Sequence, residues 1–279
     1  MHNKDSTAVT PGSISGARID INGQRLPLRI FFALLIAEIL LVLLDAVVNY
    51  AEFNKHGQIR RLFNITREDG LATWFMVTQT FVAGLVLWLI FLVQRSRGAS
   101  RGRIAGWGFL TGFFIYMAAD DGAKIHERLG SVLAAAHKPG GSVVQDDLLG
   151  RVQALFPSYD WHLVALPLLA AAGLFMLLFL WREFHDRGDR LLLLTAAGCM
   201  ALAVGLDFIE GLDDQHAWNV QVWIREAYDL TKYTVRHFAK SLEEFLEMLA
   251  MSLLLMLFVR HLIALTGWRL TLDFSATGR

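Results

Sequence analysis

The sequence has few charged residues, no net charge and only one cysteine. Charged residues make up 19% of the 279 positions and the formal charge is zero, so the composition gives no reason to expect a nucleic acid as a partner. The single cysteine, Cys199, lies inside an apolar run, which excludes a disulfide framework and a cysteine-based zinc motif. The first 28 residues lack the apolar core and the cleavage site of a secretory signal peptide.

Hydrophobic residues are abundant and make up 54% of the chain. Several apolar runs reach the roughly 20 residues that a helix needs to cross a hydrocarbon core of about 30 Å. We therefore expect an all-α, polytopic membrane protein. Its six spanning helices are predicted at about 29–50, 71–94, 104–127, 160–181, 191–211 and 242–265.

Basic loops indicate the orientation of these spans, because short loops rich in lysine and arginine stay in the cytoplasm. Seven arginines follow the second and fourth spans: Arg95, Arg97, Arg101, Arg103, Arg182, Arg187 and Arg190. We therefore expect a multi-pass protein of the bacterial inner membrane with both termini in the cytoplasm. Residues 1–28 are then a disordered cytoplasmic tail, residues 29–269 the transmembrane domain and residues 270–279 a second cytoplasmic tail.

Two long segments, 130–157 and 212–241, join helices on the outer side of the membrane. The second contains Trp218, Trp223 and Tyr228 among charged residues. This pattern is typical of a helix that lies on the membrane surface or folds over the mouth of the bundle.

Acidic residues lie at one common depth on four of the predicted spans. With a rise of about 1.5 Å per residue, Asp45, Asp120 and Asp207 lie roughly 23–24 Å from the cytoplasmic ends of their helices. Glu247 lies about 27 Å from the cytoplasmic end of the last helix. We therefore expect a polar layer in the outer leaflet. Other side chains of this layer are Gln79, Asp121, His162 and His237.

Helical spacing directs several of these side chains toward one face. Asp207 and Glu210 are three residues apart and lie on the same side of a helix. His126 lies about 120° away from the face of Asp120 in a regular helix. It joins the layer only if the chain bends near Gly122.

A layer of carboxylates inside a membrane is costly. A charged carboxylate near the bilayer centre costs about 2.5–3.5 kcal/mol even on a lenient scale, and the cost falls toward the interface. Any single acid at this depth could be a solvated residue at a helix end. For the whole layer, some acids must be protonated, paired with Lys124, Arg128 or Lys240, or bound to a cation.

Two sequence elements resemble those of a group of bacterial multi-spanning inner-membrane proteins of unknown function. The elements are DDGAKIHE at 120–127 and EEFLEM at 243–248. The group carries Ser-Leu-Asp-Glu-x-x-x-Ile-His-Glu in one helix and Glu-Glu-x-x-Glu-Met-x-Gly in the last. This sequence departs from that pattern at 118–119, at Asp121 and at Ala250. The resemblance covers most of the membrane region and implies no activity.

The residue types favour a divalent-metal site that opens to the periplasm. Carboxylates with one or two imidazoles suit zinc, iron or manganese, and such a metal can activate water to hydrolyse a lipid or lipid-linked bond. Glu127 or Glu244 is the expected general base. The expected ligands are Asp120, His126, Glu127, Asp207, Glu210, Glu244 and Glu247.

Two other functions are open on the same residues, so the sequence leaves undecided whether the protein is an enzyme. In a proton- or cation-coupled transporter the acids would carry the ion, although only Glu38 continues the layer inward. In a non-catalytic membrane sensor or assembly partner, the acids would hold helices together by hydrogen bonds. The expected partners are the lipid bilayer and a lipid or cation substrate.

Overall fold

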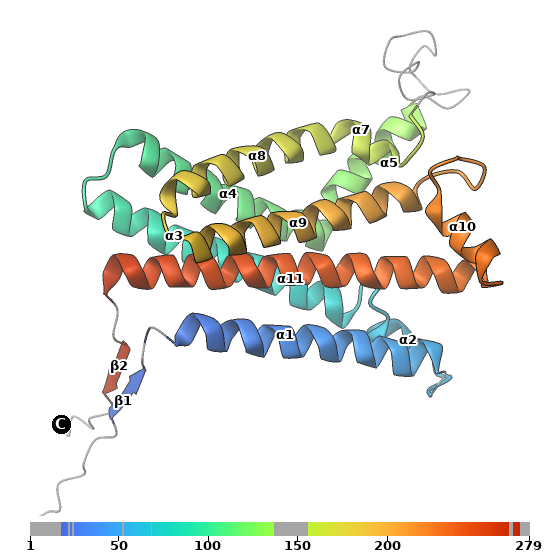
Figure 1. Ribbon diagram of the computed structural model, residues 1–279, viewed down its shortest axis with the longest axis horizontal. Coiled ribbons are helices and arrows are strands. Elements are labelled where there is room, and N and C mark those ends of the chain that lie inside the picture. Colours follow the sequence, from blue (N-terminus) through green and yellow to red (C-terminus); the bar gives the residue numbers. More distant parts are fainter. Residues whose placement is uncertain are drawn as a thin grey trace, which may run out of the picture.

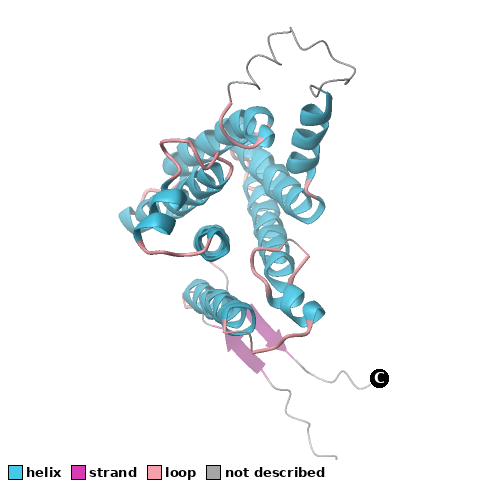
Figure 2. Ribbon diagram, turned by 90° about the vertical axis from the view of Figure 1, so that its right-hand side faces the viewer, coloured by secondary structure: helices cyan, strands magenta, loops and turns pink. Residues whose placement is uncertain are grey.

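The computed structural model of the chain describes residues 18–21, 23, 25–51, 53–67, 69–136, 156–267 and 270–273. Most of these residues are helical, and the long helices run along one direction (Figure 1). Turning the molecule by 90° brings several of them nearly end-on (Figure 2). The structure is therefore a bundle of roughly aligned helices, as the sequence predicts.

Five helices in the described part of the chain are long and apolar enough to cross a membrane. They are α1 (Leu26–Asp45) continued by the π-helical turn η1 (Ala46–Tyr50), α3 (Leu71–Ser96), α8 (Leu166–Glu183), α9 (Arg187–Glu210) and α11 (Lys232–Thr266). α11 has 35 residues and contacts α1, α3 and α9. The other packed elements are therefore arranged around this one long helix.

The third predicted span, 104–127, consists of two helices in the structure. α4 (Arg101–Ala123) packs along α3, and α5 (Ile125–Ala136) leaves it at Lys124, whose backbone is left-handed with φ 54° and ψ 46°. The prediction of one continuous helix was wrong at its outer end, because the chain turns at this residue. With 23 residues α4 is about 35 Å long, but it is less apolar than the five helices above. A count of six spans therefore stays a prediction.

Two further predicted boundaries differ from the structure. The fourth span is divided into α7 (Asp160–Val164) and α8, with Pro167 in the first turn of α8, where its missing N–H is tolerated. α11 begins at Lys232, so residues 232–241 of the predicted outer segment belong to this helix. Thr231 starts α11 by accepting a hydrogen bond from the Thr234 N–H on its Oγ1, at 3.1 Å. The sequence predicted a helix in this segment, but its charges separated it from the apolar span with which it is continuous.

The two terminal regions meet at one end of the bundle. β1 (Arg18–Ile21) pairs antiparallel with β2 (Leu270–Asp273), and this small sheet lies beyond the ends of α1 and α11 (Figure 1). The described parts of the predicted tails 1–28 and 270–279 thus form strands and the start of α1, and the remainder lies outside the described residues.

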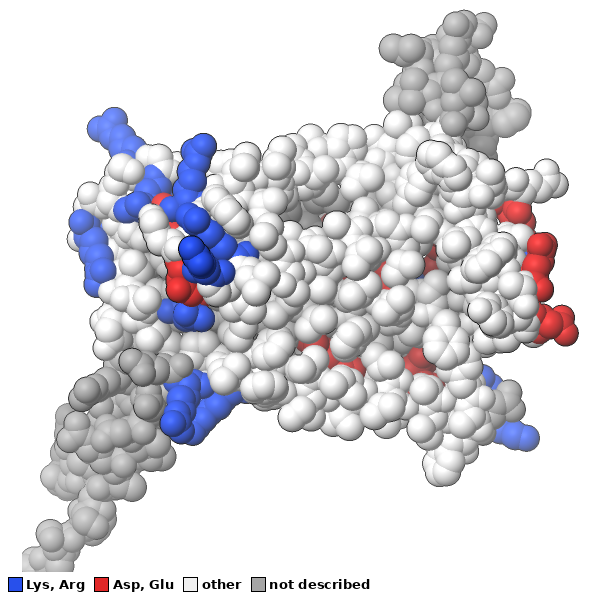
Figure 3. Space-filling view, viewed as in Figure 1, with Lys and Arg blue, Asp and Glu red and all other residues white. Residues whose placement is uncertain are grey.

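Charge is distributed unevenly along the bundle. Most lysine and arginine in this view gather at the end that carries the α3–α4 and α8–α9 loops, whereas the opposite end shows acids and a smaller basic group (Figure 3). We call the basic end the inner end and the opposite end the outer end. This asymmetry is the one expected of a membrane protein whose basic loops face the cytoplasm.

The outer end carries two short helices, α2 (Gly57–Phe63) and α10 (Val220–Ala227). α10 runs across the direction of the bundle (Figure 1). Trp218, just before α10, is 75% exposed, and Trp223, on α10, is 63% exposed, so these rings are not packed into the bundle. Most of the other predicted outer segment, 130–157, lies outside the described residues.

The apolar core fills the inner half of the bundle. Every residue of α11 from Leu253 to Val259 is apolar and buried. This stretch packs against buried residues of α3, α4, α8 and α9, including Trp107 and Leu180. The apolar stretch therefore separates the polar residues of α11 up to Ser252 from Arg260 and His261 near the inner end.

Candidate functional site

α1 and α11 bring together a buried carboxylate and a buried imidazole. His237 Nε2 lies 2.8 Å from Asp45 Oδ2, and the two residues are 4% and 1% exposed. Asn49, in η1, donates its side-chain N–H to Asp45 Oδ1 at 2.8 Å. Ser241 donates to Asp45 Oδ2 at 3.4 Å. Asp45 is therefore held from both sides while it orients His237.

The turn at Lys124 brings His126 back over Asp120. The His126 backbone N–H donates to Asp120 Oδ1 at 2.9 Å, and His126 Nδ1 lies 2.7 Å from Asp120 Oδ2. The bend that this pair requires is thus present, two residues after Gly122. Asp120 is completely buried and Asp121 is half-buried.

A third pair joins α7 to α9. His162 Nε2 lies 3.2 Å from Asp207 Oδ2, an ion-pair distance at which neither atom completes a hydrogen bond. The buried His162 ring stacks on Trp161 with centroids 4.0 Å apart. Trp161 also meets His126 edge to face at 4.7 Å, so this ring separates the second and third pairs.

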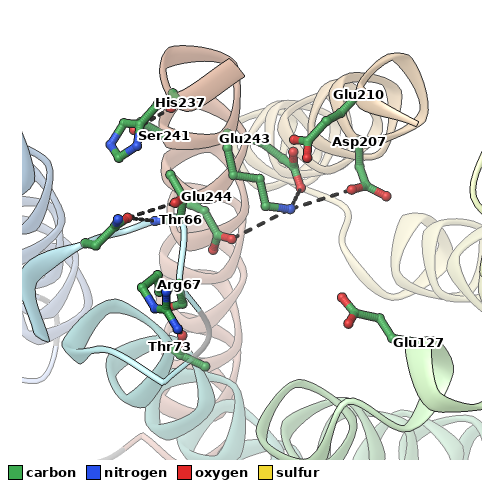
Figure 4. Close-up of polar contacts among 12 residues, drawn as sticks. Thr66, Arg67, Thr73, Glu127, Asp207, Glu210, His237, Ser241, Glu243 and Glu244 are labelled. Atoms are coloured by element: carbon green, nitrogen blue, oxygen red, sulfur yellow. Dashed lines mark hydrogen bonds and ion pairs between the residues drawn. The ribbon is translucent and has the colours of Figure 1, made fainter. Parts of the chain in front are cut away.

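Lys240 lies among three carboxylates of α9 and α11. Its Nζ is 2.6 Å from Glu243 Oε1, 3.6 Å from Asp207 Oδ1 and 3.9 Å from Glu244 Oε1. Figure 4 shows these three acids approaching the space between the two helices, with dashed lines for the ion pairs. Lys240 is thus the cation around which this part of the polar layer is organised.

Carboxylates outnumber cations where α4, α5, α9 and α11 meet. Glu244 and Glu247, one turn apart, interact electrostatically, and Glu247 also interacts with His126. The described carboxylates of this region are Asp120, Asp121, Glu127, Asp207, Glu243, Glu244 and Glu247. The cations that face them from those four helices and α7 are Lys124, Lys240, His126 and His162. Even when both imidazoles are protonated, the seven carboxylates exceed these four cations by three.

A cavity of about 540 Å³ lies beside this region at the outer end. Its charged and titratable lining is Glu127, Asp207, Glu210, Arg236, His237 and Lys240, and its aromatic lining is Tyr159, Trp161 and Tyr233. The close approach of α5 to α7 at its wall depends on Gly130, since a Cβ there would lie 2.8 Å from the Trp161 backbone nitrogen. The cavity is large enough for a headgroup or another small ligand.

Glu210 is already neutralised in the cavity wall. Arg236 Nε and Nη2 lie 3.0 and 2.8 Å from Glu210 Oε1, and the Tyr159 hydroxyl donates to the same oxygen at 3.2 Å. Burial and the neighbouring Glu210 carboxylate raise the pKa of Tyr159 to about 12, which keeps its hydroxyl protonated. Glu210 therefore stabilises the wall rather than standing ready as a ligand.

A second polar cluster lies deeper in the bundle. Ser252 donates to Glu38 Oε1 at 2.6 Å, and Gln79 Nε2 lies 2.6 Å from Ser252 Oγ and 3.2 Å from Glu38 Oε1. Glu38 precedes Asp45 by seven residues, or about 10 Å along α1. Gln79, predicted in the outer layer, belongs to this deeper cluster instead.

The predicted metal ligands are brought into one region but not to one point. Among the described residues, no group of three histidine, cysteine, aspartate or glutamate side chains is placed to hold a metal ion. The predicted ligands form carboxylate–imidazole and carboxylate–lysine pairs instead, so the metal set stays a prediction. Sequence reasoning placed Asp45 and His237 in the layer, but it did not find their direct contact, because depth gives no rotation about a helix axis.

Comparison with known proteins adds a family and no activity. No curated protein and no solved structure matches the chain. One family model matches residues 30–262, a range that contains every residue of the polar clusters and the cavity. Because this match covers most of the chain, the protein belongs to the family described as Domain of unknown function (DUF8692).

Proposed function

We propose that this protein is a multi-pass protein of the bacterial inner membrane that binds a divalent cation in a site facing the periplasm. The observation that carries the proposal is the excess of carboxylates where α4, α5, α9 and α11 meet. Buried carboxylates without counter-ions are strongly unfavourable, and protons or a bound cation must neutralise them.

His126 is the imidazole best suited to bind this cation. Its Nδ1 contacts Asp120 at 2.7 Å, which leaves Nε2 as the ring nitrogen for a metal. A histidine that binds a metal usually has its other nitrogen on a carboxylate in this way, because the contact fixes the ring and raises its basicity. Asp120 is then a supporting carboxylate rather than a ligand.

Asp121, Glu244 and Glu247 are the carboxylates that we assign to the cation. Glu244 interacts electrostatically with Glu247 and with Asp121, and Glu247 interacts with His126. Three carboxylates with one imidazole form an oxygen-rich ligand set, which suits manganese, iron or zinc. Entry of the cation draws together side chains that repel one another without it.

We confine this proposal to binding. Glu127 pairs with Lys124 at 3.7 Å and Glu244 lies 3.9 Å from Lys240, so each predicted general base already has a cation beside it.

Proton- or cation-coupled transport is the second candidate, and the cluster of Glu38, Gln79 and Ser252 favours it. On α11 this cluster extends the polar side chains inward from Glu247 to Ser252, or by about one and a half turns. The seven apolar residues from Leu253 to Val259 follow it directly and occupy about 10 Å of the helix. Binding of a cation from the outer side therefore explains more of this arrangement than transport of an ion through the bundle.

Thermal unfolding with added metal tests the binding proposal. Protein stripped with a chelator is unfolded in mild detergent with and without zinc, manganese or iron(II). A cation present at 100 times its Kd stabilises the folded state by about 2.7 kcal/mol. We expect this stabilisation in the wild type and in Glu226→Ala, a control at an exposed acid on α10, but not in Glu244→Ala/Glu247→Ala. Equal shifts in all three proteins, or in none, would refute the site.

A further inference from the structure

The pair of His237 and Asp45 has the geometry of a general base and its positioning residue. His237 Nε2 is held 2.8 Å from Asp45 Oδ2, which leaves Nδ1 as the nitrogen that exchanges a proton. His237 also lines the 540 Å³ cavity. A buried carboxylate that fixes the tautomer and orientation of a histidine is the arrangement that makes imidazole an effective base.

Two tyrosine rings contact the His237 ring, and Asn49 holds its partner Asp45. Tyr50 meets the ring edge to face with centroids 4.8 Å apart, and the Tyr233 centroid lies at 5.5 Å. The carboxylate of Asp45 is fixed in turn by Asn49, whose backbone oxygen accepts a hydrogen bond from Arg60 at 3.1 Å.

η1, which carries Asn49, has π-helical geometry. Insertions of this kind occur frequently at functional sites. Three layers of contacts, from Arg60 through Asn49 to Asp45, thus converge on one imidazole.

Two cations flank His237 on the same helix and line the same cavity. They are Arg236, one residue before it, and Lys240, three residues after it. Both are ion-paired in the wall, Arg236 with Glu210 and Lys240 with Glu243, so they supply N–H donors rather than a free positive charge. Hydrogen-bond donors beside a base can stabilise the oxyanion that forms when water attacks a carbonyl carbon. The described lining thus provides a base, side-chain donors and aromatic surface for an apolar group.

We propose that His237, positioned by Asp45, catalyses hydrolysis of a carboxylic ester of an outer-leaflet amphiphile that enters this cavity. His237 Nδ1 takes a proton from water, and the water oxygen forms a bond to the acyl carbon. The bond between the acyl carbon and the alcohol oxygen then breaks, and the imidazolium returns its proton to that oxygen. The products are a carboxylic acid and an alcohol, and the balance requires no other reactant.

This activity is separate from the proposed cation site. None of its steps uses Asp121, Glu244 or Glu247. It is therefore expected to survive treatment with a chelator, so failure of either proposal leaves the other testable. Carboxylic esters are a class that one base and nearby hydrogen-bond donors can hydrolyse with water.

The test is ester hydrolysis by the full chain in mixed micelles. The probes are p-nitrophenyl octanoate, followed by absorbance, and a diacyl phosphatidylglycerol, followed by mass spectrometry of released fatty acid. We expect His237→Ala to lose at least about 100-fold in kcat, the lower range for a general base. His216→Ala, at another histidine of the outer end, is the matched control and is expected to retain wild-type kcat.

Two readouts separate catalysis from folding. Added imidazole is expected to restore part of the activity of His237→Ala, which it would not do if the substitution had only unfolded the protein. Asp45→Asn is expected to lower kcat about 10-fold or more with little change in KM, because it misorients the base. Wild-type protein that hydrolyses neither ester, or a His237→Ala variant with wild-type kcat, would overturn the proposal.

Discussion

Replacing Lys240 by methionine tests the charge balance of the polar layer. The substitution keeps the length of the side chain and removes the cation from Glu243, Asp207 and Glu244, at 2.6, 3.6 and 3.9 Å from Nζ. With an effective dielectric constant of about 20, each contact contributes roughly 4–6 kcal/mol of attraction before desolvation. Desolvation offsets much of this, and removal of one partner from a buried pair destabilises a protein by about 3–5 kcal/mol.

The expected result is a clear fall in the unfolding temperature. For chains of similar size, 1 kcal/mol corresponds to about 2–4 °C, so Lys240→Met is expected to unfold roughly 6–20 °C lower. The assay is the loss of helical circular dichroism on heating in detergent. Lys232→Met is the matched control, because Lys232 pairs with Asp214 at the exposed start of the same helix and is expected to change little.

A second substitution makes the reasoning refutable. Adding Glu243→Gln to Lys240→Met removes the carboxylate nearest to Nζ, and we expect the double variant to regain part of the lost stability. A Lys240→Met protein as stable as the wild type would refute the charge balance. A double variant less stable than the single one would show that packing, rather than charge, is the cause.

Three further predictions concern the outer end. Gly130→Ala places a Cβ 2.8 Å from the Trp161 backbone nitrogen and is expected to destabilise the protein by about 1–3 kcal/mol, measured by the same unfolding assay; unchanged stability would contradict the close packing. Hydrogen bonds from Arg61 and Arg67 lower the pKa of the Asp69 carboxyl from 3.8 to about 2. The stability that these contacts contribute is therefore fully present above pH 3.8 and is lost as the pH falls through about 2. Hydrogen exchange of this loop is expected to rise only in that window, and a rise already complete at pH 4 would contradict the lowered pKa. The exposed Trp218 and Trp223 are expected to lie at the membrane surface, so brominated lipids should quench less fluorescence from the Trp218→Phe/Trp223→Phe variant than from the wild type; equal quenching would place them in water.

The level of the polar layer could be predicted from the sequence, and its contacts could not. Counting residues from the apolar end of its helix placed Asp45 in the layer, and helical spacing before Glu244 added His237. The two contact each other although they are 192 residues apart. Counting gives the depth of a residue but not the direction of its side chain about the helix axis. For that reason the pairing of Glu210 with Arg236, and of Gln79 with Glu38, was not predicted.

The break after α4 shows a second limit of sequence reasoning. A bend near Gly122 was predicted as the condition for His126 to join the layer, whereas the left-handed residue is Lys124. Glycine is the residue that normally adopts this backbone, and nothing in the local sequence favours a lysine there. The conformation is stabilised by a local contact across the turn, since Asp120 accepts a hydrogen bond from the His126 N–H.

The central claim is a cation site among Asp121, His126, Glu244 and Glu247. Elemental analysis of the purified protein tests this claim most directly. The protein is purified in mild detergent without chelator or affinity metal, beside the Glu244→Ala/Glu247→Ala variant. The account predicts near-stoichiometric zinc, iron or manganese in the wild type and its loss in the variant. Wild-type protein without metal, or a variant that retains the same content, would contradict it.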